Sequence, residues 1–129
     1  MIGLGTDIVQ ISSFLEQVQD TASNFVQETF STGEIRYSEG QVSGKPHQHL
    51  AVRYAAKEAF IKAWSSCNRG APPKIVRPNY QEIEVFNDPF GRPYIELKGV
   101  LAKICHLKSI QVSLSHDGNY ATATVIVER

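Results

Sequence analysis

Apolar and polar residues follow two different periods along the chain, and these divide it into strands and helices. Alternating or β-branched stretches predict five strands, at Ile2–Ile11, Ile83–Phe86, Pro93–Leu97, Ile110–Ser115 and Tyr120–Val127. Helical spacing predicts one long helix from Pro46 to about Ser65 and a short one over Val100–Leu107. This order predicts an α+β fold, in which a small, mostly antiparallel sheet packs on one long central helix.

Local signals add shorter features between these elements. Ser13-Phe-Leu-Glu16 and Ser31-Thr-Gly-Glu34 each fit a capping box, which predicts that a helix opens at each serine. Clusters of Gly, Pro, Asn and Asp predict loops or turns at residues 40–45, 68–79, 88–91 and 116–119.

The long helix has two unlike apolar faces. Its bulky face carries Leu50, Tyr54, Ile61 and Trp64, with Phe60 more to the side. Its small face carries Ala55, Ala56, Ala59 and Ala63. Small side chains permit close approach of another element, and a helix that is apolar on two faces is expected to be packed on both.

Three charged residues are candidates for chemistry. Glu58 and Lys62 lie four residues apart on one face of the long helix, and alone they would be a solvated ion pair worth roughly a few tenths of a kcal/mol. Asp7 lies in an apolar strand, where a carboxylate is costly unless it is paired, bound to metal or solvated at an edge. Carboxylates and an amine fixed on rigid elements are also what a phosphate-handling site with a hard metal requires.

Composition narrows the class of protein. A length of 129 residues with 42% hydrophobic and 20% charged residues indicates one globular domain, spanning residues 1–129. The formal net charge of zero gives no global field toward nucleic acid or membrane, so an electrostatic partner must meet a local patch. Cys67 and Cys105 have no metal or redox spacing and are expected to be reduced thiols. With no signal sequence and no apolar span, we expect a cytoplasmic protein.

Four segments together carry a resemblance to a known family. They are Gly5-Thr-Asp-Ile-Val9, Arg53-Tyr-Ala-Ala-Lys-Glu-Ala-Phe-Ile-Lys-Ala63, Asp88-Pro-Phe-Gly-Arg-Pro93, and Val112-Ser-Leu-Ser-His-Asp117 with Tyr120-Ala121. Each motif alone would match many unrelated chains. In this order, in so short a chain, they resemble the holo-acyl-carrier-protein synthases, the small bacterial type of 4′-phosphopantetheinyl transferase.

The resemblance implies a reaction and an assembly. The family transfers 4′-phosphopantetheine from coenzyme A to a serine of an acyl carrier protein, requires Mg²⁺ and releases 3′,5′-ADP. Its small members are homotrimers with active sites in clefts between neighbouring subunits. The expected fold is that of the 4′-phosphopantetheinyl transferases.

The resemblance also implies roles for particular residues. Asp7 and Glu58 match the metal-binding carboxylates and Lys62 the phosphate-binding amine, while Glu58, directly or through a metal-bound water, would accept the serine proton. The other positions that match coenzyme A-binding segments are Arg53, Gly91, Arg92, Pro93, Ser115 and His116. Taken alone, Gly91 would be a turn glycine with positive φ, and His116 would bond to its own loop.

Two departures affect the expected carrier. Many family members have a basic residue where this chain has Ser13, at a position associated with docking of the acidic carrier protein. Arg36, Lys45 or Arg69 would then have to substitute for it. The loop at 65–79 is longer and richer in proline than the family's short turn, which suggests a carrier domain of a large synthase rather than a small free protein.

Two other classes of protein compete with the enzyme. One is a non-catalytic module that binds coenzyme A or a nucleotide, and the other is a structural trimerisation domain without a ligand. The presence of Asp7, Glu58 and Lys62 together favours the enzyme. A different phosphotransfer enzyme lacks support because no P-loop or kinase motif is present.

Overall fold

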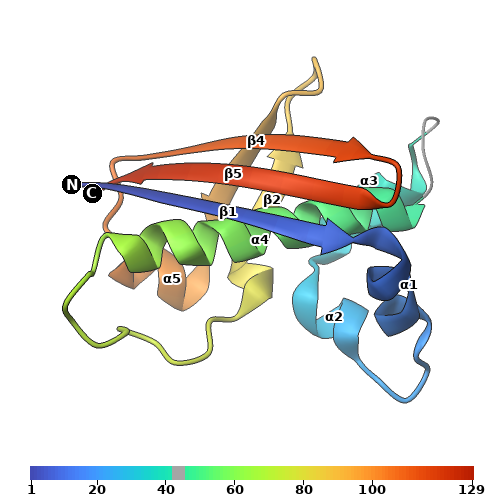
Figure 1. The fold of residues 1–129 in the computed structure, drawn as a ribbon, viewed down its shortest axis with the longest axis horizontal. Coiled ribbons are helices and arrows are strands. Elements are labelled where there is room, and N and C mark those ends of the chain that lie inside the picture. Colours follow the sequence, from blue (N-terminus) through green and yellow to red (C-terminus); the bar gives the residue numbers. More distant parts are fainter. Residues whose placement is uncertain (42–45) are drawn as a thin grey trace.

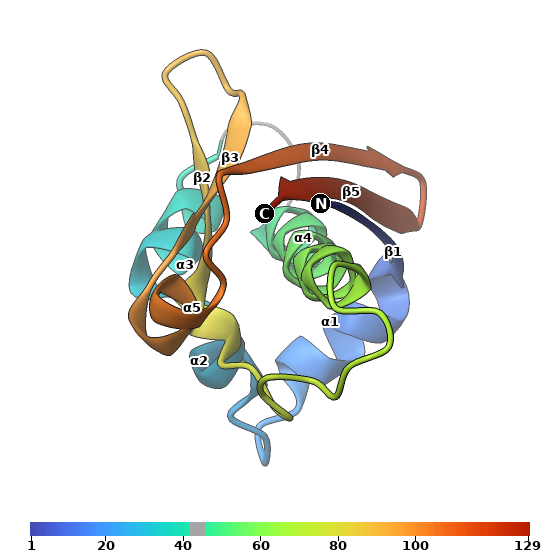
Figure 2. The same ribbon diagram turned by 90° about the vertical axis from the view of Figure 1, so that its left-hand side faces the viewer.

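The computed structural model describes residues 1–41 and 46–129 and has the predicted α+β class. In chain order its elements are β1 (Ile2–Gln10), α1 (Ile11–Gln19), α2 (Phe25–Thr29), α3 (Thr32–Glu39), α4 (Pro46–Ser66), the 3₁₀ turn η1 (Tyr80–Glu82), β2 (Ile83–Asn87), β3 (Pro93–Leu97), α5 (Gly99–Ile104), β4 (Ser109–Asp117) and β5 (Tyr120–Glu128). Strands β1, β5 and β4, in that order, form an antiparallel sheet, and β2 and β3 form a separate hairpin. Helix α4 runs along one face of the sheet, and the smaller helices and the hairpin surround its other sides (Figures 1 and 2).

Helix α4 approaches β1 closely through its small face, as predicted. Ala59 and Ala63 are fully buried there. A Cβ on Gly3 would lie 2.0 Å from the carbonyl oxygen of Ala63, and one on Gly5 would lie 2.1 Å from that of Ala59. These contacts are with backbone atoms, which cannot move aside as a flexible side chain can. The two glycines of β1 are therefore the complement of the alanine face of α4.

The bulky face of α4 packs against the N-terminal helices. The ring of Tyr54 lies 5.7 Å from that of Phe14 on α1 and 5.5 Å from that of Phe25 on α2. Phe30 adds an edge contact with Phe14. This aromatic cluster fixes α1 and α2 beside the middle of α4.

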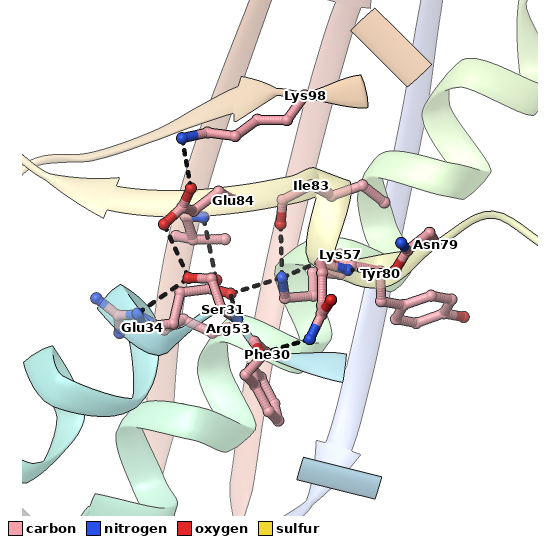
Figure 3. A network of polar contacts seen from close by, with 12 residues as sticks. Phe30, Ser31, Glu34, Arg53, Lys57, Asn79, Tyr80, Ile83, Glu84 and Lys98 are labelled. Carbon is pink, nitrogen blue, oxygen red and sulfur yellow. Dashed lines mark hydrogen bonds and ion pairs between the residues drawn. The ribbon is translucent and has the colours of Figure 1, made fainter. Parts of the chain in front are cut away.

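A buried ion pair ties α3, α4 and the start of β2 together (Figure 3). Lys57 Nζ donates to Glu34 Oε1 at 2.8 Å and to the carbonyl oxygens of Tyr80 and Ile83 at 2.8 and 2.6 Å. Glu34 also accepts the backbone N–H of Val85 at 3.1 Å. Burial lowers the pKa of Lys57, and the charge of Glu34 acts against that shift. The surrounding acceptors thus compensate an ammonium group that is fully withdrawn from water.

The two predicted capping boxes have different outcomes. The box at Ser31 and Glu34 is confirmed at the start of α3. The one at Ser13 is wrong, because α1 begins at Ile11 directly after β1. Its first free N–H groups are capped from the β4–β5 turn: Ile11 N–H donates to the carbonyl of Asn119 at 2.7 Å, and Ser12 N–H to Asn119 Oδ1 at 2.9 Å.

Smaller differences concern the ends of elements. Helix α5 is shorter than predicted and ends at Ile104, shortly before His106 with a φ of 50°. Helix α2 and the turn η1 are not predicted, and the expected loop at 40–45 lies partly outside the described residues.

Cys67 and Cys105 are buried free thiols, as predicted, and burial raises the pKa of Cys105 to about 11. Across the described helices, none is long and apolar enough to cross a membrane.

Candidate active site

The three candidate residues for chemistry meet in one cleft between β1, α1 and α4. Asp7, Glu58 and Lys62 all line it, and its volume is about 460 Å³. Asp7 pairs with Ala123 in the sheet, so it lies on the same face as the inward-facing Gly5 of β1 and points toward α4. Two elements far apart in sequence therefore supply the cleft's carboxylates.

Lys62 forms its ion pair with the strand rather than with its own helix. Its Nζ lies 3.0 Å from Asp7 Oδ1 and also donates to the carbonyl of Thr6 at 3.0 Å. The Lys62 side chain is 53% exposed, while that of Asp7 is 17% exposed. The interpretation of Glu58 and Lys62 as a surface ion pair is thus wrong, since Lys62 instead reaches across the cleft to Asp7.

Glu58 is held by tyrosines that sequence reasoning does not identify. The hydroxyl of Tyr80 donates to Glu58 Oε1 at 2.9 Å, and the ring of Tyr80 stacks on that of Tyr54 at 6.0 Å. Burial first, and then the carboxylate of Glu58, raise the pKa of both tyrosine hydroxyls, with a further contribution from Asp7. Both hydroxyls therefore remain protonated donors at physiological pH. Asp7 and Glu58 act on the same pair of tyrosines, which is a second indication that they lie near each other.

The two carboxylates fit one kind of metal site. Within residues 1–41 and 46–129, no group of three or more His, Cys, Asp or Glu side chains could hold a metal ion. A complete protein cage is therefore not formed there. Mg²⁺, however, is commonly held by one or two carboxylates together with substrate phosphates and water. Asp7 and Glu58 fit such a site if the substrate supplies the remaining oxygens.

A second cleft of about 470 Å³ lies between α4, the hairpin and β4, and it is lined by Arg53, Gly91, Pro93 and His116 among others. Arg53 is 3% exposed, its guanidinium lies 4.3 Å from the ring centre of Tyr37, and Nη2 donates to Asn87 Oδ1 at 2.5 Å.

Asn87 connects Arg53 to the turn of the hairpin, because its Nδ2 donates to the carbonyl of Gly91 at 3.0 Å. Burial lowers the pKa of Arg53, although Tyr37 and Glu34 oppose the shift, and its Nε has no partner in the described part of the chain. Gly91 has the predicted positive φ, of 83°.

Residues 3–125 match the family model described as the 4′-phosphopantetheinyl transferase superfamily. This chain belongs to the 4′-phosphopantetheinyl transferase superfamily. It is 44% identical over 133 residues to a holo-[acyl-carrier-protein] synthase of Corynebacterium glutamicum, covering 98% of both chains. It is 41% identical over 128 residues to the same enzyme of Nocardia farcinica, covering 99% of this chain and 88% of the relative.

A solved structure supports the same assignment. The acyl-carrier-protein synthase–CoA complex of Chronobacterium ammoniagenes matches with a TM-score of 0.89 at 40% identity and covers 99% of this chain and 97% of that one. The predicted family, its fold and its enzyme class, a phosphopantetheinyl transferase, are therefore confirmed.

In this member of the superfamily, the predicted site residues separate into two groups. Arg53 and Lys62 are nine residues apart on α4, which at about 100° per residue places them on opposite sides of the helix. Gly91, Pro93 and His116 join Arg53 in its cleft. A single copy therefore presents two clefts, one with the carboxylates and amine and one with the buried guanidinium.

Two of the predicted positions lie in neither cleft. The Arg92 side chain is 77% exposed and lies 3.8 Å from Asp88. Ser115 pairs with Thr122 and alternates with the inward-facing His116, so its side chain is on the outer face of the sheet.

Tyr54 and Tyr80 are the residues that the sequence did not identify. Tyr54 stands four residues before Glu58, a spacing that lets the two side chains meet, but its ring equally fits the bulky apolar face of the helix. Tyr80 follows an irregular loop, where no periodicity indicates its position.

Proposed function

We propose that this chain transfers 4′-phosphopantetheine from coenzyme A to a serine of an acyl carrier protein, with Mg²⁺, and releases adenosine 3′,5′-bisphosphate. The observation that carries the proposal is the convergence of Asp7, Glu58 and Lys62 on one cleft in a chain of this superfamily. The names of the relatives and the CoA complex of a similar enzyme support the same donor and acceptor.

The residues of the first cleft have complementary roles in this reaction. The serine oxygen attacks the β-phosphorus of coenzyme A, the bond from that phosphorus to the oxygen of the 3′,5′-ADP leaving group breaks, and Glu58 takes the serine proton directly or through water. Asp7 and Glu58 would hold Mg²⁺, which when bound neutralises the diphosphate and the charge that forms on the leaving group. Lys62, half exposed and already in the cleft, would add a second positive charge beside the phosphates.

The second cleft would receive the nucleotide end of coenzyme A. Arg53 is a fixed guanidinium whose Nε has no partner among residues 1–41 and 46–129, and the hairpin turn at Gly91 is joined to it through Asn87. Guanidinium groups suit recognition of phosphate because they are planar and always charged. His116 lies at the same cleft and would contribute a further donor.

We propose a homotrimer in which the Arg53 cleft of one copy faces the Asp7 cleft of the next. The outer face of the sheet supports association between copies. Ile2, Leu4 and Ile8 of β1 are 69, 62 and 65% exposed there, and Ile126 of the neighbouring β5 is 45% exposed. Exposed apolar side chains gathered on one face of a sheet in this way are typical of an interface between chains.

The acceptor would be a free acyl carrier protein or a carrier domain of a fatty acid synthase, and the reaction would take place in the cytoplasm. No nucleic acid or membrane partner is proposed, in keeping with the net charge of zero.

Intact-mass analysis of an apo carrier protein, incubated with this protein, coenzyme A and Mg²⁺, tests the proposal. We expect the carrier to gain the mass of one phosphopantetheine arm, and the gain to disappear when EDTA removes the metal. Coenzyme A binding without a mass gain on several carriers would indicate a binding module instead. An absence of both binding and transfer would indicate a structural domain.

A further inference from the structure

The balanced net charge conceals a strong separation of charges along the chain. Residues 59–81 contain no Asp or Glu, and their charged residues are Lys62, Arg69, Lys74 and Arg77. Residues 1–35 contain no Lys or Arg, and their charged residues are Asp7, Glu16, Asp20, Glu28 and Glu34. The chain therefore contains one basic and one acidic segment, and the two do not overlap in sequence.

Most of the basic segment lies in the loop at residues 67–79, between α4 and η1, and the cations of this loop face solvent. Arg69, Lys74 and Arg77 are exposed and belong to none of the ion pairs found in the described part of the chain. Val76 stands among them and is 84% exposed. The loop thus presents unpaired positive charge around an apolar side chain.

The loop is anchored to the fold at both ends. Asn68 Nδ2 donates to the carbonyl of Trp64 at 3.2 Å, and Asn68 Oδ1 accepts from Arg129 at 2.6 Å. At the other end Asn79 Oδ1 accepts the N–H of Gln81 at 3.1 Å. The two ends of the loop are therefore held beside α4 and η1.

The loop borders the proposed active site. Lys62 lines the cleft with Asp7 and Glu58, and it also lines a shallow groove with Arg69. The loop lies beneath one half of α4, and α1 and α2 lie beneath the other half (Figure 1). Helix α1 carries exposed Glu16 on that side of the molecule and no basic residue. A partner that enters the cleft therefore meets positive charge on the loop side and negative charge on the α1 side.

We propose that the loop at residues 67–79, and not α1, is the docking surface for the acceptor, a protein whose contact surface is acidic and has an apolar patch for Val76. The inference rests on the proposed function, because that function requires the acceptor to reach Glu58. Complementary charge at such a rim accelerates encounter and orients the partner, while the acidic α1 would repel the same surface. A basic residue at the position of Ser13 on α1 is then not needed for docking, because Arg69 and Arg77 supply the positive charge.

Steady-state transfer kinetics with an apo carrier protein test the docking surface. We expect Arg69→Gln/Arg77→Gln to lower kcat/KM for the carrier about tenfold and to weaken its dependence on salt. The loss should appear in KM for the carrier, with kcat at saturating carrier and KM for coenzyme A unchanged. Lys103→Gln/Lys108→Gln removes two exposed charges elsewhere and should leave all these values unchanged.

Each outcome bears on one proposal. If wild-type protein transfers the arm and the loop variant has unchanged kcat/KM, or the control variant loses as much, the docking inference is overturned while the proposed function stands. If Arg36→Gln lowers kcat/KM for the carrier and the loop variant does not, docking takes place on α3 and the docking inference is also overturned. If wild-type protein transfers nothing, the proposed function fails. In that case, binding to the immobilised apo carrier tests the docking surface without any reaction. About tenfold weaker binding of the loop variant than of wild type supports the docking inference, and equal binding or no binding overturns it.

Discussion

At the scale of single residues, the orientation of Glu58 depends on a side chain from outside its helix. Tyr80 reaches Glu58 from η1, and the backbone carbonyl of Tyr80 is itself bound by the buried Lys57 (Figure 3). The carboxylate proposed to accept the serine proton is therefore connected to the buried ion pair of Lys57 and Glu34. This makes Tyr80 a positioning residue for the reaction.

The variant Tyr80→Phe tests this role. It removes the hydroxyl and keeps the ring that stacks on Tyr54, so we expect kcat to fall about tenfold. Because a hydrogen bond to a charged group is worth about 1.5–3 kcal/mol, the melting temperature should fall by several degrees while the protein stays folded at the assay temperature. The KM for coenzyme A should be unchanged. Tyr94→Phe, on the exposed hairpin, is the control and should keep full activity. An unchanged kcat in Tyr80→Phe would show that Glu58 does not need this hydrogen bond.

At the scale of elements, the position of the site depends on how closely β1 approaches α4. Asp7 lies two residues after Gly5, whose missing side chain lets the strand rest on the backbone of α4. Any outward displacement of β1 would carry Asp7 away from Lys62, which lies 3.0 Å from it.

The variant Gly5→Ala should therefore be strongly destabilising. Its Cβ would lie 2.1 Å from the carbonyl oxygen of Ala59, so we expect a loss of about 3 kcal/mol in the free energy of unfolding, measured with urea. Gly40→Ala is the control, because a Cβ there meets its nearest atoms only at 3.4 and 3.7 Å and should cost little. Equal stability of Gly5→Ala and wild type would contradict the close packing of β1 on α4.

The contact of β2 with α3 should make stability depend on pH. Burial alone would raise the pKa of Glu84, but hydrogen bonds from Lys98 and Ser31, both at 2.8 Å, outweigh it and lower the pKa below the usual 4.5. Because the folded value lies below the unfolded one, the stabilisation is fully present above about pH 4.5 and is lost as pH falls through the folded value.

We expect Glu84→Gln to cost about 1 kcal/mol of unfolding free energy at pH 7 and progressively less below pH 4. Urea unfolding at several pH values measures this difference. The exposed Glu39→Gln should give no such difference, and a gap for Glu84→Gln that widens in acid would contradict the assignment.

These elements also show what could be predicted from the sequence. Helix α4, both hairpins and the capping box at Ser31 depend on periodicity or turn chemistry within a few residues, and all are confirmed. The start of α1 is set by Asn119, which lies 107 positions from Ser12, and the burial of Lys57 depends on acceptors from α3 and β2. Such long-range contacts leave no local pattern, and for the same reason no local signal identifies Tyr80 as a partner of Glu58.

At the scale of the whole molecule, the two clefts lie on opposite sides of α4, so a reaction site that uses both would need a second copy of the chain. The Asp7 cleft and the Arg53 cleft share no lining residue. The apolar outer face of β1 and β5 offers a surface on which copies can associate. A trimer would thereby join the two kinds of cleft at each interface.

Mixing two inactive variants tests this arrangement. Glu58→Gln removes function from one cleft and His116→Ala from the other, so co-refolding them in equal amounts should restore about a quarter of wild-type activity, because random assembly leaves about that share of interfaces with both halves intact. Light scattering should give three times the 14.3 kDa of one chain. Activity no greater than the sum of the two variants would place the whole site within one copy.

The central claim is that the edge of α4 that carries Glu58 and Lys62, together with Asp7 of β1, performs the chemistry. The most direct measurement is the rate of arm transfer to an apo carrier protein by Asp7→Asn and Glu58→Gln at saturating coenzyme A and Mg²⁺. The control is Asp117→Asn, at the exposed end of β4. We predict a loss of about 10²–10³-fold in each of the first two variants, with native melting curves, and full activity in the control. Unchanged turnover in either Asp7→Asn or Glu58→Gln would contradict the claim.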